Sequence, residues 1–250
     1  MLRHLTTLAA TAILLNGAPQ ERAHFEVASV KVHAGPMPRI GMHPSGNRLT
    51  IEAQSLAGLI SDAFGIEFDR IVLPEQLRNE SVFYDVVAKA EGDRARTVGE
   101  LRQMLQNLLA ERFALKVHRE TRAMAVYALV LDKGGPKFHE SNGDDGAQGN
   151  FVVDGTMQKM AQVKCDMACL ARSIRMSFVW DRPVVDRTGL KGTYDVKLQA
   201  TPQYWMGKEP DADNVSIFTA LREQLGLRLE PRKLPIEVLV VDSAEKPELN

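Results

Sequence analysis

Two side chains that could bind a metal ion, His118 and Glu120, lie two residues apart in a segment that alternates like a β-strand. Alternate residues of a strand point to the same face, so both side chains can approach one ion. A zinc site needs a third protein ligand, and none follows at a recognisable spacing. The histidines also lack the i,i+4 pair of zinc peptidases. We interpret this pair as an exposed strand end and predict no metal site.

The segment around Asp186 is similar to the catalytic motif of aspartic proteases, in which two apolar residues precede Asp-Thr-Gly. Here Arg187 is inserted between the aspartate and the threonine, where we expect it to pair with the carboxylate. A mechanism with a shared proton also requires a second such aspartate close by. We therefore predict a turn whose backbone is set by Asp186 and Gly189.

Other motifs for catalysis or cofactor binding are missing from the chain. No serine stands in the Gly-x-Ser-x-Gly frame of a nucleophile elbow. The segment Gly134–Lys137 has the wrong spacing for a phosphate-binding loop, and its proline has no N–H to offer a phosphate. The sequence therefore predicts no catalytic residue and no cofactor.

The two cysteines, Cys165 and Cys169, lie four residues apart at the predicted start of a helix. An export route would permit a disulfide, and the even number of cysteines fits one. On a regular helix, however, the Cβ atoms of residues i and i+4 are usually farther apart than the ~3.8 Å of a disulfide. We expect two small buried hydrophobic side chains, with a disulfide as the alternative.

Basic residues gather near two segments that we predict to be hairpins, one in each half of the chain. Arginine-bearing strand edges could hold a carboxylate or phosphate group of a partner. The alternative is that these charges keep strand edges soluble and discourage edge-to-edge pairing. The candidate binding residues are Lys116, Arg119 and Arg122 in the first half, and Arg228, Arg232 and Lys233 in the second.

Tyr204 and Trp205 stand in a segment otherwise rich in Pro, Gly, Lys, Glu and Asp. Exposed aromatic side chains in such a loop favour a partner surface, because they supply a large contact area at a small cost in entropy. Alternatively, the loop folds back and Trp205 fills a gap between two lobes. We add both aromatic residues to the candidate binding surface.

The composition is that of an ordinary globular protein, with 250 residues, 44% apolar and 25% charged. The net charge of -1 creates no field that would attract the whole molecule to nucleic acid, so we expect no nucleic-acid partner. Residues 1–20 have the basic start and short apolar stretch of a signal peptide. We therefore predict a periplasmic or secreted protein, and no later segment is apolar enough to cross a membrane.

The predicted secondary-structure elements follow in an order that occurs twice. A strand, an amphipathic helix, a strand, a second helix and an apolar hairpin run from Leu49 to Asp132 and again from Met157 to Asp242. Tyr84 and Asp85 in the first half correspond to Tyr194 and Asp195 in the second. Repetition of this kind indicates an internally duplicated architecture.

The predicted fold class is α+β, with two related lobes that each have a small mixed sheet covered by amphipathic helices. After the signal peptide of residues 1–20, residues 21–132 form an N-terminal strand plus the first lobe. Residues 133–156, which are rich in glycine, form a mobile linker, and residues 157–250 form the second lobe. A single sheet built from both halves is the alternative.

Helix starts are well marked in the sequence. Ser55, Asp166 and Ser216 precede apolar stripes and are typical N-caps. Thr97 and Glu100 form a capping box, in which each side chain satisfies an N–H of the first turn. Each of the four helices has one apolar face, so we expect each to cover a sheet.

Seven blocks of the chain together carry a family resemblance: Phe25–Lys31, His118–Arg122, Val126–Val130, Lys133–Lys137, Arg182–Leu190, Gly192–Asp195 and Ser216–Leu221. They resemble a Solibacter-type family of exported proteins of unknown function that is expanded in acidobacteria. The family has no established activity, so the resemblance implies only a domain of unknown function outside the cytoplasm. Some relatives resemble extracellular tails of membrane metallopeptidases of the antibiotic-sensor kind, which implies sensing or binding.

The sequence leaves two functional hypotheses. The first is an exported, non-catalytic binding module whose partner is an envelope protein, a peptide or a cell-wall fragment. The second is an extracytoplasmic hydrolase that uses carboxylates such as Asp186 and Asp195, or an unrecognised metal site with His118. We favour the first, because the sequence carries an export signal and a repeat but no catalytic motif.

Overall fold

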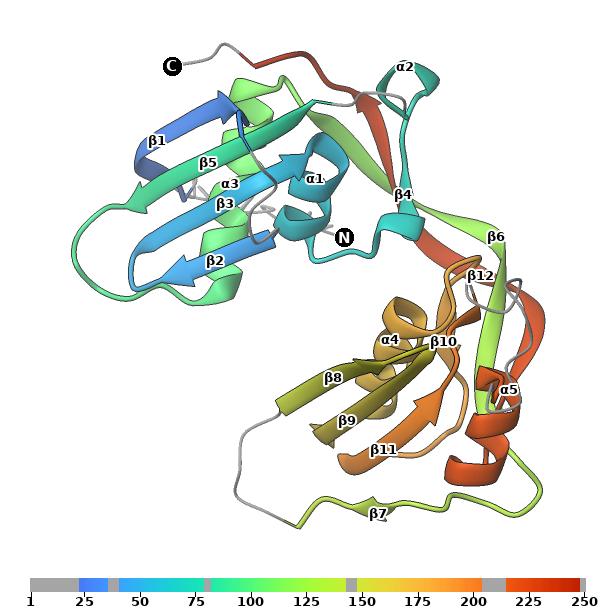
Figure 1. The fold of residues 1–250 in the computed structure, drawn as a ribbon. Coiled ribbons are helices and arrows are strands. Elements are labelled where there is room, and N and C mark those ends of the chain that lie inside the picture. The colour runs from blue at the N-terminus through green and yellow to red at the C-terminus, as the bar shows by residue number, and fades with distance from the viewer. Residues whose placement is uncertain (1–22, 36–40, 79–81, 143–147, 204–214, 248–250) are drawn as a thin grey trace, which may run out of the picture. The chain divides into compact units, whose positions relative to one another are not determined.

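The computed structural model describes residues 23–35, 41–78, 82–142, 148–203 and 215–247 (Figure 1). The predicted signal peptide, Tyr204 and Trp205 lie outside the described residues. The fold is α+β, as predicted, with three four-stranded sheets. The chain forms two compact units. Of the described residues, the first unit holds those within 23–66, 73–116 and 241–247, and the second holds those within 67–72 and 117–240.

The first unit contains sheet A, in which the strands have the order β1-β5-β3-β2 and all pairs are antiparallel. Buried and exposed residues alternate along β5, so one face of the sheet is covered and the other is exposed. Helices α1 and α3 pack against each other and against this sheet. The elements are β1 (Phe25–Val32), β2 (Gly41–Ser45), β3 (Arg48–Ser55), α1 (Leu56–Phe64), α2 (Glu75–Arg78), β5 (Phe83–Ala90) and α3 (Val98–Arg112).

The second unit contains two sheets. Sheet B has the order β10-β6-β12-β4, and sheet C has the order β7-β11-β9-β8. Helix α4 packs on β9 and β10, whereas α5 and η3 pack on β11. The elements are η1 (Phe68–Arg70), β4 (Ile71–Val72), β6 (Lys116–Leu131), β7 (His139–Glu140), β8 (Gln148–Asp154), β9 (Met157–Cys165), α4 (Met167–Ser177), β10 (Val184–Asp186), β11 (Tyr194–Ala200), α5 (Ile217–Ala220), η3 (Leu221–Leu225) and β12 (Leu227–Ser243).

The predicted helix starts are confirmed by the hydrogen bonds at each cap. The side chains of Ser55, Asp166 and Ser216 each accept a bond from the backbone N–H three residues later. Thr97 and Glu100 form the reciprocal capping box at the start of α3. The helix that begins after Ser216 ends at Gly226, whose φ of 66° suits glycine.

The two predicted hairpins are wrong. In each place the structure has one long strand, β6 or β12, and the two strands are neighbours in sheet B. They run in opposite directions, because Arg119 contacts Glu237 near one end and Asp132 bonds to Gly226 near the other. The polar residues 118–122 suggested a turn, but they include none of the Gly, Asn or Asp residues that tight turns require.

The segment 133–156, predicted to be a glycine-rich linker, contributes two strands. β7 pairs with β11, and β8 pairs with β9 along its whole length. β8 is the edge strand of sheet C, and all of its residues are exposed. An exposed strand shows no buried alternation in its sequence, and this explains why the pattern favoured a loop.

Sheets A and C share the same order and direction of strands, and the two Tyr-Asp segments occupy corresponding places in them. Tyr84 on β5 lies opposite Gln54, the residue before the N-cap of α1. Tyr194 on β11 lies opposite Cys165, the residue before the N-cap of α4. Both tyrosines are buried. That the two halves arose by duplication stays a prediction.

Candidate functional site

The exposed face of sheet C carries a groove. Its larger part has a volume of about 660 Å³, and a neighbouring hollow of about 300 Å³ shares three lining residues with it. A volume of this size is in the range of small-ligand sites. We call the whole surface the sheet C groove; its polar lining includes Lys137, His139, Glu140, Asp195, Lys197 and Gln224.

Strand β11 supplies the floor of the groove. Its residues alternate between buried and exposed, so Tyr194, Val196 and Leu198 face the core, whereas Asp195 and Lys197 face outward. The buried residues pack into one cluster with α4, α5 and η3. The outward acid and base are therefore held by a strand whose other face is fixed in a hydrophobic core.

The wall beside β11 comes from η3 and the segment before β7. The Gln224 side chain accepts a hydrogen bond from the Gln199 N–H at 3.0 Å and donates one to the Gln199 carbonyl at 2.8 Å. Its amide thus bonds the edge of β11 as a peptide group of a neighbouring strand would. Lys137 is held against η3, because its backbone N–H donates to the Leu225 carbonyl and its ammonium to the Glu223 carbonyl.

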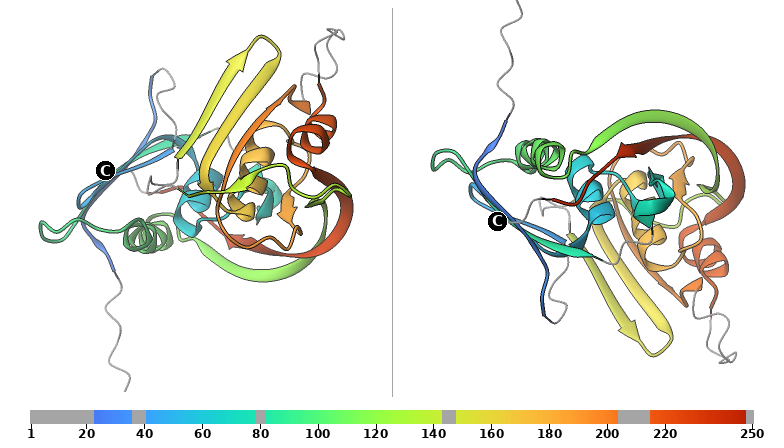
Figure 2. Two further views of the ribbon diagram at one scale, coloured as in Figure 1. Left: turned by 90° about the horizontal axis from the view of Figure 1, so that it is seen from below. Right: turned by 90° about the horizontal axis from the view of Figure 1, so that it is seen from above.

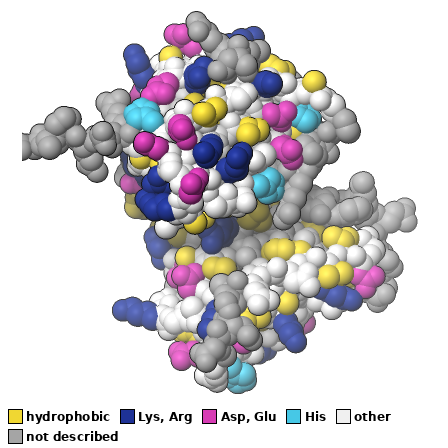
Figure 3. Space-filling model, turned by 90° about the vertical axis from the view of Figure 1, so that its left-hand side faces the viewer, with side chains coloured by type: hydrophobic (Ala, Val, Ile, Leu, Met, Phe, Trp, Pro, Cys, Tyr) yellow, Lys and Arg dark blue, Asp and Glu magenta, His cyan; other side chains and the backbone are white. Residues whose placement is uncertain are grey.

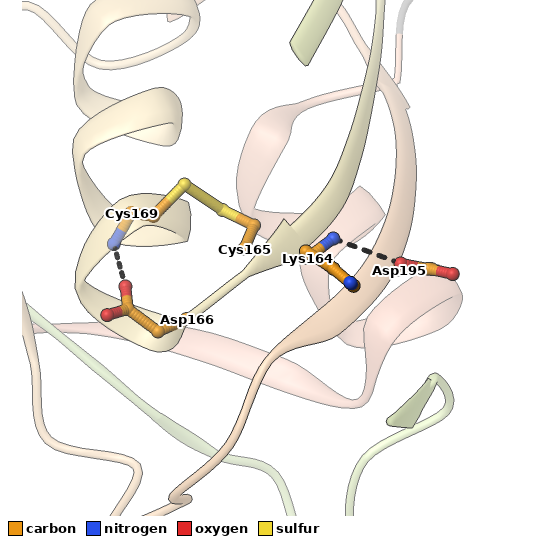
Figure 4. The surroundings of a disulfide bond; sticks show 5 residues. All are labelled: Lys164, Cys165, Asp166, Cys169 and Asp195. Carbon is orange, nitrogen blue, oxygen red and sulfur yellow. Dashed lines mark hydrogen bonds between the residues drawn. A yellow bond between two sulfur atoms is a disulfide. The ribbon is translucent and has the colours of Figure 1, made fainter. Parts of the chain in front are cut away.

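Asp195 is fixed at a corner of the groove. Its carboxylate accepts a hydrogen bond from the Lys164 backbone N–H at 3.1 Å, and this bond holds the pKa of Asp195 below its ordinary value. Lys164 has a φ of 51°, which turns its N–H toward Asp195 just before α4 (Figure 4). Asp195 is therefore ionised at neutral pH.

Charges of both signs line the groove. Lys197 makes no ion pair with any residue that the structure describes, and it lies next to Asp195 on the same strand. At the far end, Lys159 pairs with Asp154 at 2.8 Å. The groove therefore offers ammonium groups, carboxylates and an amide within one hollow, and this mixture suits a polar ligand with both donors and acceptors.

The two cysteines form a disulfide, so our expectation of two unbridged side chains is wrong. Cys165 is the last residue of β9, and Asp166 caps the helix that contains Cys169 (Figure 4). The i,i+4 argument fails because the first cysteine is extended rather than helical. Their Cα atoms are 5.5 Å apart, well inside the range of disulfides.

His118 and Glu120 lie near the start of β6, and Asp186 is the last residue of β10. His118 and Glu120 point the same way, with Nε2 and Oε2 3.7 Å apart; His118 is exposed and Glu120 is half-buried. No group of three potential ligands that could hold a metal occurs in the described parts of the chain. Asp186 accepts bonds from the N–H and the hydroxyl of Thr188, both at 2.8 Å, as expected for the predicted turn. The predicted pairing of Arg187 with the carboxylate is wrong, because its guanidinium donates to the backbone carbonyl of Asp186 at 2.9 Å.

The arginines of the predicted binding surface lie along β6 and β12 rather than at hairpin ends. Arg119 pairs with Glu237, Arg122 with Glu120, and Arg228 and Arg232 both pair with Glu230. The two lysines, Lys116 and Lys233, are exposed. Because each arginine has a carboxylate partner, these strands present a surface of paired acidic and basic side chains rather than a basic binding surface.

Acidic and basic side chains are also intermixed elsewhere. Figure 3 shows Lys and Arg side chains interspersed with Asp and Glu over one face of the molecule. This agrees with the net charge of -1. In the described part of the chain, none of the helices combines the length and apolar character needed to span a bilayer.

Sequence reasoning did not find the groove. Its residues come from five separate segments and form no motif, so no spacing marks them. The only sequence signal is the alternation of polar and apolar residues from Tyr194 to Ala200, which shows that one face of this strand is exposed.

Comparison with known protein families matches residues 57–244 to the family described as "Protein of unknown function (DUF3738)". The match covers more than half of the chain, and the chain belongs to this family. Searches of the curated proteins and of the solved structures found no match.

Proposed function

We propose that this protein is an exported, non-catalytic binding module that holds a polar peptide segment in the sheet C groove. The peptide would come from an envelope protein or from a cell-wall fragment. The observation that carries this proposal is the groove itself. Its size suits a ligand, and its lining offers fixed hydrogen-bond donors and acceptors.

The chemistry of the lining favours a peptide. Peptide groups supply one donor and one acceptor each, and Gln224 shows that an amide can bond the exposed edge of β11 through both. Lys197 and Asp195 would take the carboxylate and ammonium groups of a peptide's side chains or ends. Asp195 is suited to this role because it stays ionised at neutral pH.

Three observations support a place outside the cytoplasm. The chain begins with a basic and then apolar stretch typical of a signal peptide. Cys165 and Cys169 are joined, and structural disulfides persist in oxidising compartments. The resemblance to an exported acidobacterial family, some of whose relatives are fused to sensor-type membrane metallopeptidases, points the same way.

The groove is a better binding site than the basic residues of β6 and β12. Arg119, Arg122, Arg228 and Arg232 already have carboxylate partners, which a ligand would have to displace. Lys197 has no such partner among the described residues, and it lies inside a hollow. A ligand anion therefore meets less competition at Lys197.

The test is affinity capture from an envelope extract that is split into a protein fraction and a cell-wall fragment fraction. Two charge reversals are compared with the unchanged chain: Lys197→Glu in the groove and Lys233→Glu on β12. We expect Lys197→Glu to weaken retention of the captured ligand about tenfold or more, and Lys233→Glu to leave it unchanged. The fraction that binds identifies the source of the peptide.

Two results would contradict the proposal. Loss of capture with Lys233→Glu but not with Lys197→Glu would place binding on the long strands. Turnover of a peptide or cell-wall substrate that is abolished by Asp195→Asn would show that the protein is a hydrolase.

A further inference from the structure

The edge strand β8 of sheet C exposes apolar side chains on both of its faces. Phe151 and Val153 point to one face and Val152 to the other, with exposed fractions of 44%, 67% and 49%. Figure 2 shows the β8–β9 hairpin (yellow) projecting from the rest of its unit. Such a strand combines exposed apolar surface with a row of backbone groups that no described strand of its own sheet pairs.

The pairing of sheet C tells which backbone groups of β8 point outward. Gln199 directs its N–H and carbonyl to Gln224, away from β9. In an antiparallel pair, two opposite residues either bond to each other or both direct their backbone groups away from each other. Lys159 lies opposite Gln199, which points away from β9, so the N–H and carbonyl of Lys159 point away from β11 and toward β8. Lys159 lies opposite Val152, so the backbone groups of Val152 point toward β9.

The residues on either side of Val152 therefore direct their N–H and carbonyl groups to the open edge. The pairing of β8 with β9 continues without a bulge, so this alternation holds for the whole strand. The outward-directed residues are Gly149, Phe151 and Val153. Phe151 is the central residue of β8, and the other two lie symmetrically about it.

β8 lacks the features that usually protect edge strands. It contains no proline, no lysine and no bulge, whereas the edge strand β2 of sheet A contains Pro44. The single charge of β8, Asp154, lies at its end and pairs with Lys159 of the same hairpin. An unprotected apolar edge of this kind indicates a pairing surface.

We propose that β8 pairs with β8 of a second copy of this chain, antiparallel and around a twofold axis at Phe151. This register places every outward residue in a bonded pair, because Phe151 meets its own counterpart and Gly149 meets Val153 of the other copy. The two copies of sheet C then form one continuous sheet. A second copy is favoured over an unrelated partner because the strand is complementary to itself.

Side-chain placement supports this register. The two Phe151 rings lie side by side on one face, where aromatic cross-strand pairs are stabilising. Asp154 lies opposite Gln148 of the other copy, so no like charges face each other. The axis is perpendicular to the sheet, so both grooves open on the same side. A ligand with two binding segments would gain avidity from this arrangement.

The experiment is sedimentation equilibrium of the purified chain, together with three variants. The unchanged chain is expected to show twice the mass of one chain. Phe151→Lys places two ammonium groups together at the axis and is expected to give the single-chain mass. Val152→Lys, the matched control, places its lysine opposite Asn150 and is expected to remain a dimer. Circular dichroism confirms that each variant is folded.

Gln148→Lys tests the register itself. It places a lysine opposite Asp154 at both ends of the pair and is expected to tighten the dimer, with a dissociation constant lowered on the order of tenfold. The proposal is overturned if the unchanged chain keeps the single-chain mass at high concentration. It is also overturned if the dimer persists in the folded Phe151→Lys variant, since that dimer would use another surface.

Discussion

The carboxylate of Asp195 accepts a hydrogen bond from the backbone N–H of Lys164, and the carboxylate of Asp85 accepts one from Ala53 at 2.8 Å. Lys164 and Ala53 both have positive φ, 51° and 48°, and each stands just before the N-cap of a helix. An aspartate on the neighbouring strand thus fixes the strand-to-helix corner in both units. In the second unit this corner borders the sheet C groove.

Removing the carboxylate at the first corner should destabilise the first unit. Asp85→Ala leaves the N–H of buried Ala53 without its acceptor and also removes the contact with His33. We expect a loss of about 1–3 kcal/mol in the free energy of unfolding, measured by urea denaturation. Asp85→Asn keeps an acceptor oxygen and should lose less. Equal losses in the two variants would show that the corner does not depend on this hydrogen bond.

Glycine should be tolerated better at Lys164, in the second corner, than at Lys197 on the neighbouring strand. Lys164→Gly relieves the cost of a positive φ in a residue with a side chain, so we expect stability to rise by about 1 kcal/mol. Lys197→Gly, in regular extended backbone on β11, should lower it by about 0.5–1 kcal/mol. A destabilising effect of Lys164→Gly as large as that of Lys197→Gly would argue against the strain.

The capping box of α3 should contribute to acid sensitivity. Hydrogen bonds from Arg94 and from the Thr97 backbone lower the pKa of Glu100 from 4.5 to about 2. Because the folded pKa is below the unfolded value, the stabilisation is complete above pH 4.5 and is lost as the pH falls toward 2. Glu100→Gln should therefore flatten the decline in urea midpoint between pH 5 and pH 2. An unchanged slope would contradict this assignment.

The disulfide closes a short loop, so its effect on stability should be modest. The chain-entropy relation gives roughly 2 kcal/mol for a loop of this length. We expect Cys165→Ala with Cys169→Ala to lower the free energy of unfolding by about that amount, and reductant to have the same effect on the unchanged chain. Thiol titration of denatured protein isolated from the envelope should find no free thiol. Two titratable thiols there would contradict a bridge formed on export.

The parts of the fold that depend on local signals were predictable. The caps at Ser55, Thr97 and Asp166 were identified because an N-cap side chain bonds to a backbone group only three residues away. The α+β class and the corresponding places of Tyr84 and Tyr194 followed from the order of the elements. These features need no knowledge of distant contacts.

The remaining features depend on pairings that the sequence does not encode locally. The polar centres of β6 and β12 resemble turns in the sequence and so favour hairpins, and only pairing across the chain shows that each strand is continuous. The disulfide was missed because Cys165 belongs to a strand, not to the helix that follows. The groove joins Lys137, Lys197 and Gln224, which are far apart in sequence.

The most direct test of the proposed function is photo-crosslinking in the native envelope. A photoreactive residue is placed at Lys197 in the groove or, for comparison, at Arg122 on β6, and crosslinked products are identified by mass spectrometry. We predict one defined peptide-containing product from position 197 and only background from position 122. A defined product from position 122 alone, or no defined product from either position, would contradict a binding module that uses the sheet C groove.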